Sequence, residues 1–210
     1  MEKYHKIETV YKRDDGTKKL IEGEFRSETV EFLKDNTWLF TEKIDGTNVR
    51  VCWDGHSVNF AGRTDNAQFH PTLSKRLNDL FCGEDTEQLF EQKFGEKEVI
   101  LFGEGYGPKI QNGGNYRDDV DFILFDVKVG GTFLEHENVV SIAKSFGIEY
   151  APVLVSGTIE DGVDYVKNHE QSEVAQNGHE LEGLVGRPVY ELRDKRGKRL
   201  VVKIKKRDFK

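Results

Sequence analysis

The sequence predicts an α+β fold with largely antiparallel sheets, and three observations support that prediction. Apolar runs of strand length recur along the 210 residues, 21 glycines are spread through the turns between them, and helical patterns are fewer. Strand and helix patterns do not alternate strictly, which disfavours a doubly wound parallel sheet. A chain of this length buries about 70% of its unfolded surface, so it can build a core without disulfides or metals.

Several segments have the residue pattern of strands. In 48–53 apolar side chains alternate with Arg50 and Cys52, and an Asp-Gly turn then leads into 57–60, so we expect a hairpin. The other expected strands are short apolar runs at 38–41, 98–103, 121–129, 153–155, 184–186 and 200–204.

Three segments have the apolar spacing of helices. One apolar stripe lies in 73–81 and a second in 139–146, where Gly147 is well placed just past the helix end. Thr158 and Asp161 have the spacing of a capping box, which predicts that a third helix begins there.

Composition and motifs argue against several classes of protein. No apolar run approaches 18 residues, so we expect no membrane span, and residues 1–6 have no apolar stretch behind them, so we expect no signal peptide. Only Cys52 and Cys82 are present, which favours a reduced, cytoplasmic compartment. Because no Pro-rich linker or internal repeat divides the chain, we expect a single domain over residues 1–210.

Charge is unevenly distributed along the chain. The net charge is −7, yet the segment 187–210 contains 11 basic and 3 acidic residues and is therefore strongly positive. A basic end on an acidic body indicates a local site for an anion such as phosphate or nucleic acid. From charge alone, a solvated and poorly ordered tail is an equally good explanation.

Two strand ends carry polar residues in settings suited to ligand binding. Lys43 ends an apolar strand, and the Asp-Gly-Thr-Asn turn after it would hold the lysine at the rim of a sheet. Glu104 follows an apolar strand and lies among glycines, which let a ligand approach the backbone. Taken alone, each has a simpler explanation: an exposed lysine before a turn, and a solvated glutamate in a glycine loop.

Three further segments contain candidate site residues. The run 121–127 contains Phe125 and, by itself, is best explained as a core strand. Glu182 is a second carboxylate at a strand edge. Lys203 and Lys205 fall on one face of a strand because strand side chains alternate with a period of two. Like charges on one strand face repel each other, and an anion bound between them would relieve that repulsion.

In their order along the chain, these segments resemble the motif set of the covalent nucleotidyltransferases, which comprise ATP-dependent DNA and RNA ligases and mRNA capping guanylyltransferases. The resemblance runs from about Trp38 to Lys205 and rests on Lys43-x-Asp45-Gly46, Glu104, Phe125-Asp126, Glu182-Gly183 and Lys203-x-Lys205. The closest resemblance is to the RNA ligases of the T-even phage nick-sealing type and the trypanosome editing ligases, through Glu42-Lys43, Gly46-Thr47-Asn48 and Arg63-Thr64.

The resemblance implies a nucleotidyltransferase (ATP-grasp-like) fold of antiparallel sheets flanked by helices, with a nucleotide pocket between sheets. It also implies a reaction in three steps. A lysine attacks the α-phosphate of ATP and expels pyrophosphate, the AMP passes to a 5′-phosphate end of RNA, and a 3′-hydroxyl attacks that end and releases AMP. ATP and Mg²⁺ or Mn²⁺ are the implied cofactors.

The resemblance further implies which residues carry this chemistry. Lys43 is the nucleophile, and it must attack as a neutral amine. Lys203 and Lys205 would favour that neutral form, because nearby cations disfavour an ammonium, and they would hold the α-phosphate. Glu182 would help to bind the metal through water, since Mg²⁺ gives up its waters reluctantly.

The remaining matched residues are implied contacts of the nucleotide or of RNA. These are Glu42 with the adenine, Glu104 with the ribose hydroxyls, Phe125 stacked on the base, Arg63 with the phosphate of the AMP or of the RNA 5′ end, and Asn48 with the nucleotide or the RNA end. Asp45 fits the general motif without a clear role. Strand alternation sets Arg50 opposite Val49 and Val51 and leaves open that it is only a surface charge.

The implied partners are ATP and RNA ends or a nicked duplex, with no membrane partner. The second domain usual in this superfamily has no counterpart after Lys205, so we expect no accessory domain in this chain and a protein partner that supplies it. The net charge of −7 argues against a large RNA surface, and we expect weak binding near the basic end. The alternatives are a minimal DNA ligase, a capping-type guanylyltransferase, or a degenerate adenylate- or RNA-binding module.

Overall fold

The computed structural model describes residues 2–210, which form two compact units built from interleaved parts of the chain. The first unit contains 45–151 together with the short segments 2–4 and 175–179, and the second contains 5–44, 152–174 and 180–210. Because the chain passes between the units several times, no single linker separates them in the sequence.

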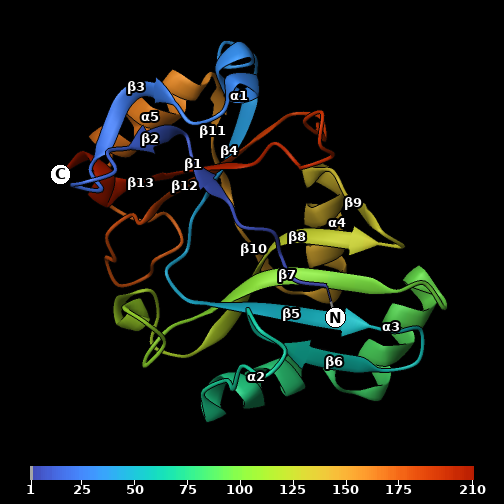
Figure 1. Ribbon diagram of the computed structural model, residues 1–210. Coiled ribbons are helices and arrows are strands. Elements are labelled where there is room, and N and C mark those ends of the chain that lie inside the picture. The colour runs from blue at the N-terminus through green and yellow to red at the C-terminus, as the bar shows by residue number, and fades with distance from the viewer. Residues whose placement is uncertain (1) are drawn as a thin grey trace. The chain divides into compact units, whose positions relative to one another are not determined.

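The first unit is built around one sheet (Figure 1). Its strands are β5 (Thr47–Trp53), β6 (Val58–Ala61), β7 (Val99–Tyr106), β8 (Asp121–Val129), β9 (Thr132–Phe133) and β10 (Glu149–Tyr150). The order is β10-β8-β7-β5-β6, with β9 paired to β8. All of these pairs are antiparallel except β10 with β8, which is parallel.

Helices pack against one face of this sheet and form the core of the first unit. They are α2 (Pro71–Phe81), α3 (Glu84–Phe94) and α4 (His136–Phe146). Strand residues such as Val51 and Leu101 share a buried cluster with Leu77 of α2 and Phe90 of α3. Because side chains alternate along a strand, the residues between them on β5 and β7 lie on the opposite face, away from these helices. That opposite face carries the polar residues of interest.

The second unit contains a five-stranded sheet and a separate hairpin. The sheet strands are β1 (Glu8–Thr9), β4 (Trp38–Glu42), β11 (Val153–Gly157), β12 (Gly183–Pro188) and β13 (Val202–Lys205), in the order β1-β13-β12-β4-β11. The hairpin pairs β2 (Tyr11–Arg13) with β3 (Leu20–Phe25). Only β1 with β13 is parallel among the paired strands described in this unit.

Helix α5 (Ile159–Asn168) provides most of the helical packing in the second unit, beside the single-turn helix α1 (Glu28–Phe32). Val163 and Val166 of α5 lie in one buried cluster with Trp38 and Phe40 of β4. Two 3₁₀ turns complete the elements: η1 (Gly113–Asn115) in the first unit and η2 (Lys206–Phe209) in the second.

The structure confirms the α+β class with largely antiparallel sheets, and every expected strand and helix overlaps an observed one. The capping box between Thr158 and Asp161 is present, and Gly147 ends α4 in a left-handed conformation. Sequence analysis missed α1, α3 and the strands β1–β3, β9 and β10. Helix α3 was missed because Phe90 is its only fully buried residue, so it has no apolar stripe. Within residues 2–210, no helix combines the length and hydrophobicity needed to cross a membrane.

Candidate active site

Lys43 directly follows β4 and remains attached to the sheet of the second unit. Its backbone N–H donates to the carbonyl of Gly183 at 2.9 Å, which extends the antiparallel pairing of β4 with β12 by one residue. The strand before it is buried through Trp38 and Phe40, so the backbone at Lys43 is firmly anchored. Its side chain is 24% exposed, so the amine lies at the edge of the packed region.

Glu182 bridges two of the candidate lysines. Its Oε2 lies 2.6 Å from Nζ of Lys43, and its Oε1 lies 3.6 Å from Nζ of Lys205. The backbone fixes this arrangement, because the Glu182 carbonyl accepts from the N–H of Lys206 at 2.9 Å and extends the β12–β13 pairing. An ion pair of this kind stabilises the ammonium form of a lysine.

Lys203 and Lys205 lie two residues apart on β13, as the period of a strand requires. The pKa of Lys203 is lowered chiefly by burial and then by the charges of Lys205 and Lys43. The pKa of Lys205 is lowered chiefly by burial and also by Lys43, while Glu182 opposes the shift. Lys43 and Lys205 thus share the Glu182 carboxylate, while Lys203 is influenced by both lysines and by Glu8. Three lysines against two carboxylates leave an excess of positive charge that suits an anion.

Gly183 allows the strands that carry these lysines to approach closely. It pairs with Lys205 across the sheet and accepts the hydrogen bond from Lys43 on its other side. Its φ is +149°, and a Cβ there would overlap the carbonyl oxygen of Ile204 and lie 2.9 Å from Cα of Lys205. Any side chain at this position would therefore push β12 and β13 apart.

Glu42, the residue before Lys43, is buried and points into the second unit. Its carboxylate accepts a short hydrogen bond from the Ser172 hydroxyl, and bonds from the N–H groups of Glu173 at 3.0 Å and Val174 at 3.2 Å. Burial raises the pKa of Glu42, and these hydrogen bonds oppose that shift. Sequence reasoning missed Ser172 because it is 130 residues away and has no local signal.

The first unit contains a second group of candidate residues on the sheet face opposite the helices. Asn48 of β5 pairs directly with Glu104 of β7. The same face carries Arg50 two residues along β5, and Phe125 lies with Phe102 in a small apolar cluster there. Asn48, Arg50 and Glu104 are therefore brought to one face of the sheet by strand alternation and register.

A β-bulge sets the orientation of Phe125. Phe102 pairs with Asp126 and Gly103 pairs with Leu124, so Phe125 is the extra residue of β8. Its half-buried ring packs edge-on against the ring of Tyr4, with centroids 5.2 Å apart. Bulges commonly re-aim a side chain next to a functional site.

The possibility that Arg50 is only a surface charge is wrong, because its side chain is fully buried. Its guanidinium donates to the carbonyl of Gly62 at 2.8 Å, to the carbonyl of Glu2 at 2.9 Å and to Asp65 Oδ1 at 2.8 Å. The N-terminal segment covers this face of β5, which strand alternation alone could not reveal. By holding the carbonyl of Gly62, Arg50 positions the backbone immediately before the exposed Arg63.

Asp45, which the sequence left without a role, ties a loop to the start of β5. Its N–H donates to the Tyr116 hydroxyl at 3.1 Å, and its Oδ2 accepts from Asn112 Nδ2 at 3.1 Å. Next to it, Gly46 packs so closely on β7 that a Cβ would lie 2.8 Å from Cγ of Glu104. The turn after Lys43 is therefore fitted against the strand that carries Glu104.

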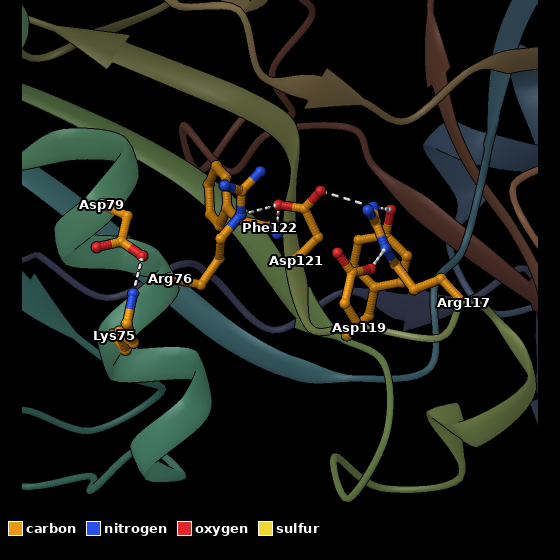
Figure 2. A network of polar contacts seen from close by, with 8 residues as sticks. Lys75, Arg76, Asp79, Arg117, Asp119, Asp121 and Phe122 are labelled. Carbon is orange, nitrogen blue, oxygen red and sulfur yellow. Dashed lines mark hydrogen bonds and ion pairs between the residues drawn. The ribbon is translucent and has the colours of Figure 1, made fainter.

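A polar network holds the other end of the same loop (Figure 2). Figure 2 shows Arg76 of α2 and Arg117 of the loop on opposite sides of the Asp121 carboxylate, at 2.9 Å and 2.6 Å. Arg117 also donates to Asp119 Oδ1 at 2.5 Å and to the Tyr106 hydroxyl at 3.1 Å. These ion pairs and hydrogen bonds raise the pKa of Arg117, although burial opposes the shift, and the network fixes the start of β8.

Comparison with known proteins identifies the family to which this chain belongs. The model of the RNA ligase family matches residues 36–205, which is most of the chain. The chain belongs to the RNA ligase family. No curated protein sequence matches it.

Several solved structures of an RNA ligase from Naegleria gruberi have the same fold as this family member. One, a lysine-to-alanine mutant with ATP and Mn, has a TM-score of 0.63 and 18% identity and covers 84% of this chain and 51% of its own. Another, with PPi, has a TM-score of 0.63 and 20% identity, with coverages of 84% and 51%. The chain thus spans about half the length of the solved chains it matches.

Proposed function

We propose that this RNA ligase family member is an ATP-dependent RNA ligase that joins 5′-phosphate and 3′-hydroxyl ends through a lysyl-AMP intermediate and an RNA-adenylate. The observation that carries the proposal is the pairing of Lys43 and Lys205 with Glu182, together with the electrostatic influence of both lysines on Lys203. A family match alone does not select a nucleophile, whereas this cluster places one lysine at a strand end beside two further cations. Structures of the N. gruberi ligase with ATP, with AMP and Mn, and with PPi support the nucleotide and the metal.

In the first step, neutral Nζ of Lys43 attacks the α-phosphorus of ATP. An N–P bond forms, the bond from that phosphorus to the bridging oxygen breaks, and pyrophosphate leaves with its electron pair. The amine must give up its proton, and Lys203 and Lys205 favour this by disfavouring a further positive charge nearby. The same two cations stabilise the negative charge that grows on the phosphate oxygens.

Glu182 has a part in this step because its carboxylate oxygen lies 2.6 Å from Nζ of Lys43 in the structure described. The nucleophile is released when the carboxylate exchanges this ion pair for another partner. Among residues 2–210 no cluster of three or more His, Cys, Asp or Glu side chains is placed to hold a metal. Mg²⁺ commonly uses one or two carboxylates plus phosphates and waters, and the 21% exposed Glu182 beside phosphate-binding lysines fits that pattern. When bound, the metal would neutralise phosphate charge.

The other candidate residues are proposed to bind the nucleotide or the RNA end. Glu104 accepts from the ribose hydroxyls, and Asn48, its cross-strand neighbour, contacts the nucleotide or the RNA end. Phe125 stacks on the base from its bulge, and the exposed Arg63 contacts a phosphate. A contact of Glu42 with adenine must share carboxylate oxygens that already accept hydrogen bonds from the protein.

In the later steps AMP passes from Lys43 to the 5′-phosphate of RNA, and a 3′-hydroxyl then displaces AMP to form the new phosphodiester. We extend the proposal to the T-even phage nick-sealing type and to residues 1–210 acting as one adenylyltransferase domain. We also extend it to action in the cytoplasm on RNA ends or nicked duplexes, together with a protein partner. The turn Gly46-Thr47-Asn48 and the pair Arg63-Thr64 support that type.

The decisive experiment is the intact mass of the protein after incubation with ATP and Mg²⁺. We expect one added AMP, lost in Lys43→Arg, because an arginine stays protonated and cannot attack. Lys144→Arg, at an exposed position on α4, is the matched control and should take up AMP. If Lys43→Arg is labelled as well as the control, the assignment of the nucleophile is wrong.

Nucleotide and strand specificity follow from the same assay. Replacing ATP by GTP tests for a capping-type enzyme, and offering RNA or DNA ends to the labelled protein tests for a DNA ligase. We expect ATP and RNA to be preferred.

A further inference from the structure

The segment between β12 and β13 forms an ordered hairpin, which we call the basic hairpin (residues 189–200). The N–H of Leu200 donates to the carbonyl of Leu192 at 3.0 Å, and Arg193 and Arg199 form an antiparallel bridge. At the tip, the N–H of Asp194 donates to the carbonyl of Lys198 at 2.8 Å. The segment is therefore a structured surface and not a loose tail.

Both acidic residues of the basic hairpin are engaged in holding it together. Glu191 forms a two-pronged ion pair with Arg199, at 2.5 Å and 2.9 Å. Asp194 accepts from the N–H groups of Arg196 at 2.8 Å and Lys198 at 2.9 Å, and these bonds lower its pKa. The negative charges are thus turned toward the backbone of the hairpin.

The cations at the tip point outward. The side chains of Lys195, Arg196 and Lys198 are exposed, and within residues 2–210 none of them lies within ion-pair distance of a carboxylate. Asp194 lies at the same tip, so three cations stand against one carboxylate there. Closely spaced, exposed cations in such excess are a recognition surface for the regularly spaced phosphates of a nucleic acid strand.

An exposed aromatic side chain lies in the same hairpin. Tyr190 is 70% exposed and Leu192 is 38% exposed, although both are large apolar side chains that usually pack inward. An exposed ring and exposed cations on one hairpin are the combination that binds unpaired bases, which stack on the ring while the phosphates of the strand contact the cations. A base inside a duplex has no free face for such stacking.

The basic hairpin also lines a cavity of about 790 Å³ in the second unit. Its lining includes the cations Arg26, Lys195, Arg196 and Lys198 and also the carboxylates Glu8, Glu28 and Asp194. Val202 also lines the cavity, so the cavity reaches the first residue of β13, the strand that carries Lys203 and Lys205. Its volume lies within the range of about 300–1,000 Å³ typical of ligand sites.

We infer that the basic hairpin binds a single-stranded stretch of the RNA substrate, with the phosphates on Lys195, Arg196 and Lys198 and a base stacked on Tyr190. This inference rests on the proposed function for the identity of the ligand as RNA. The phosphates of RNA would then be the counter-charge of the basic segment 187–210 in an otherwise acidic chain.

The test is the binding of a labelled single-stranded oligoribonucleotide to the full chain, measured by fluorescence anisotropy over a range of salt concentrations. For Lys195→Ala/Arg196→Ala/Lys198→Ala we expect weaker binding and a loss of about 2 from the slope of log K against log salt, because each phosphate contact contributes about 0.7. For Tyr190→Ala we expect a loss of about 5-fold to 140-fold with little change in slope. Tyr190→Phe should restore binding.

The matched control is Lys93→Ala/Lys97→Ala/Lys144→Ala, which removes three exposed positive charges from the first unit. We expect this variant to keep nearly all of the RNA affinity and slope. Equal losses in the two triple variants would overturn the inference, since net charge would then explain both. So would a Tyr190→Ala protein that binds single strands and duplex RNA as the wild type does.

AMP uptake from ATP, measured without RNA, separates this inference from the proposed function. A wild-type protein that takes up no AMP but binds RNA through the basic hairpin contradicts the ligase proposal alone. A protein that takes up AMP but binds RNA equally well with or without the three cations contradicts the hairpin alone.

Discussion

In the second unit the candidate residues contact one another directly, whereas in the first unit they are positioned by residues that take no part in the chemistry. Lys43, Glu182 and Lys205 form a chain of ion pairs. Asn48 and Glu104 are aligned by strand register, while Arg50 and Asp121 hold the surrounding backbone. The first arrangement concentrates like charges, and the second is a scaffold of hydrogen bonds and ion pairs. We therefore expect substitutions in the second unit to affect chemistry most, and substitutions in the first unit to affect stability.

The largest expected effect is on chemistry in the second unit. Lys205→Ala should slow AMP transfer to Lys43 by about 10²- to 10³-fold, because removing one preorganised group that stabilises developing charge has that cost. Stopped reactions analysed by intact mass give the rate directly. Lys144→Ala is the control for loss of a positive charge. A Lys205→Ala protein that reacts as fast as this control would show that the ion-pair chain has no part in the reaction.

The next effect concerns the spacing within the ion-pair chain. Gly183→Ala should lower the free energy of unfolding by about 2 kcal/mol or more, because the added Cβ clashes with backbone atoms of β13 and requires an unfavourable φ. It should also slow AMP uptake, since Lys43 and Lys205 are held on either side of this glycine. Urea unfolding and the mass assay measure the two effects. Gly114→Ala, at a position with open space, is the control.

A third prediction tests whether the scaffold of the first unit stabilises without taking part in chemistry. Asp121→Asn should cost about 1–3 kcal/mol, because two arginines lose the buried carboxylate that pairs them. Asp79→Asn should cost at most about 0.5 kcal/mol, because its pair with Lys75 is an exposed contact along one helix. Figure 2 contains both pairs. Equal costs in urea unfolding would contradict the role given to Asp121.

This contrast also explains how much the sequence could reveal. The strand ends beside Lys43 and Glu182 were predictable, because strands end in local turn chemistry. Glu104 was expected just after its strand, but it lies within β7 (Val99–Tyr106) and pairs with strands on both sides. The antiparallel α+β class followed from the same local patterns. The supporting contacts were not predictable, because they join residues far apart in the chain: Tyr4 with Asp126, and Glu42 with Ser172.

Burial is the property that local patterns described least well. Arg50 alternates with Val49 and Val51, which is the pattern of a strand with one solvated face. The N-terminal segment covers that face instead, and no periodicity in β5 can report a covering by residues 2–4. The bulge at Phe125 was equally hidden, since an extra residue in a strand becomes visible only against the register of its partner.

The smallest expected effect tests whether repulsion among the lysines of the second unit lowers the stability of the fold. The pKa of Lys203 is lowered below its ordinary value of 10.5, chiefly by burial and then by Lys205 and Lys43, so the folded protein binds that proton less well than the unfolded chain does. The protonated lysine therefore destabilises the fold at neutral pH, and this cost disappears as the pH rises toward 10.5.

Lys203→Met should consequently be more stable than the wild type by about 1 kcal/mol or less at pH 7, and the difference should shrink as the pH approaches about 10. Urea unfolding at both pH values measures it, with Lys144→Met as a control at an exposed position. A stability difference for Lys203→Met that stays constant or grows with pH would mean that the lysine cluster is not under electrostatic strain, and that the ion pair between Lys43 and Glu182 already balances it.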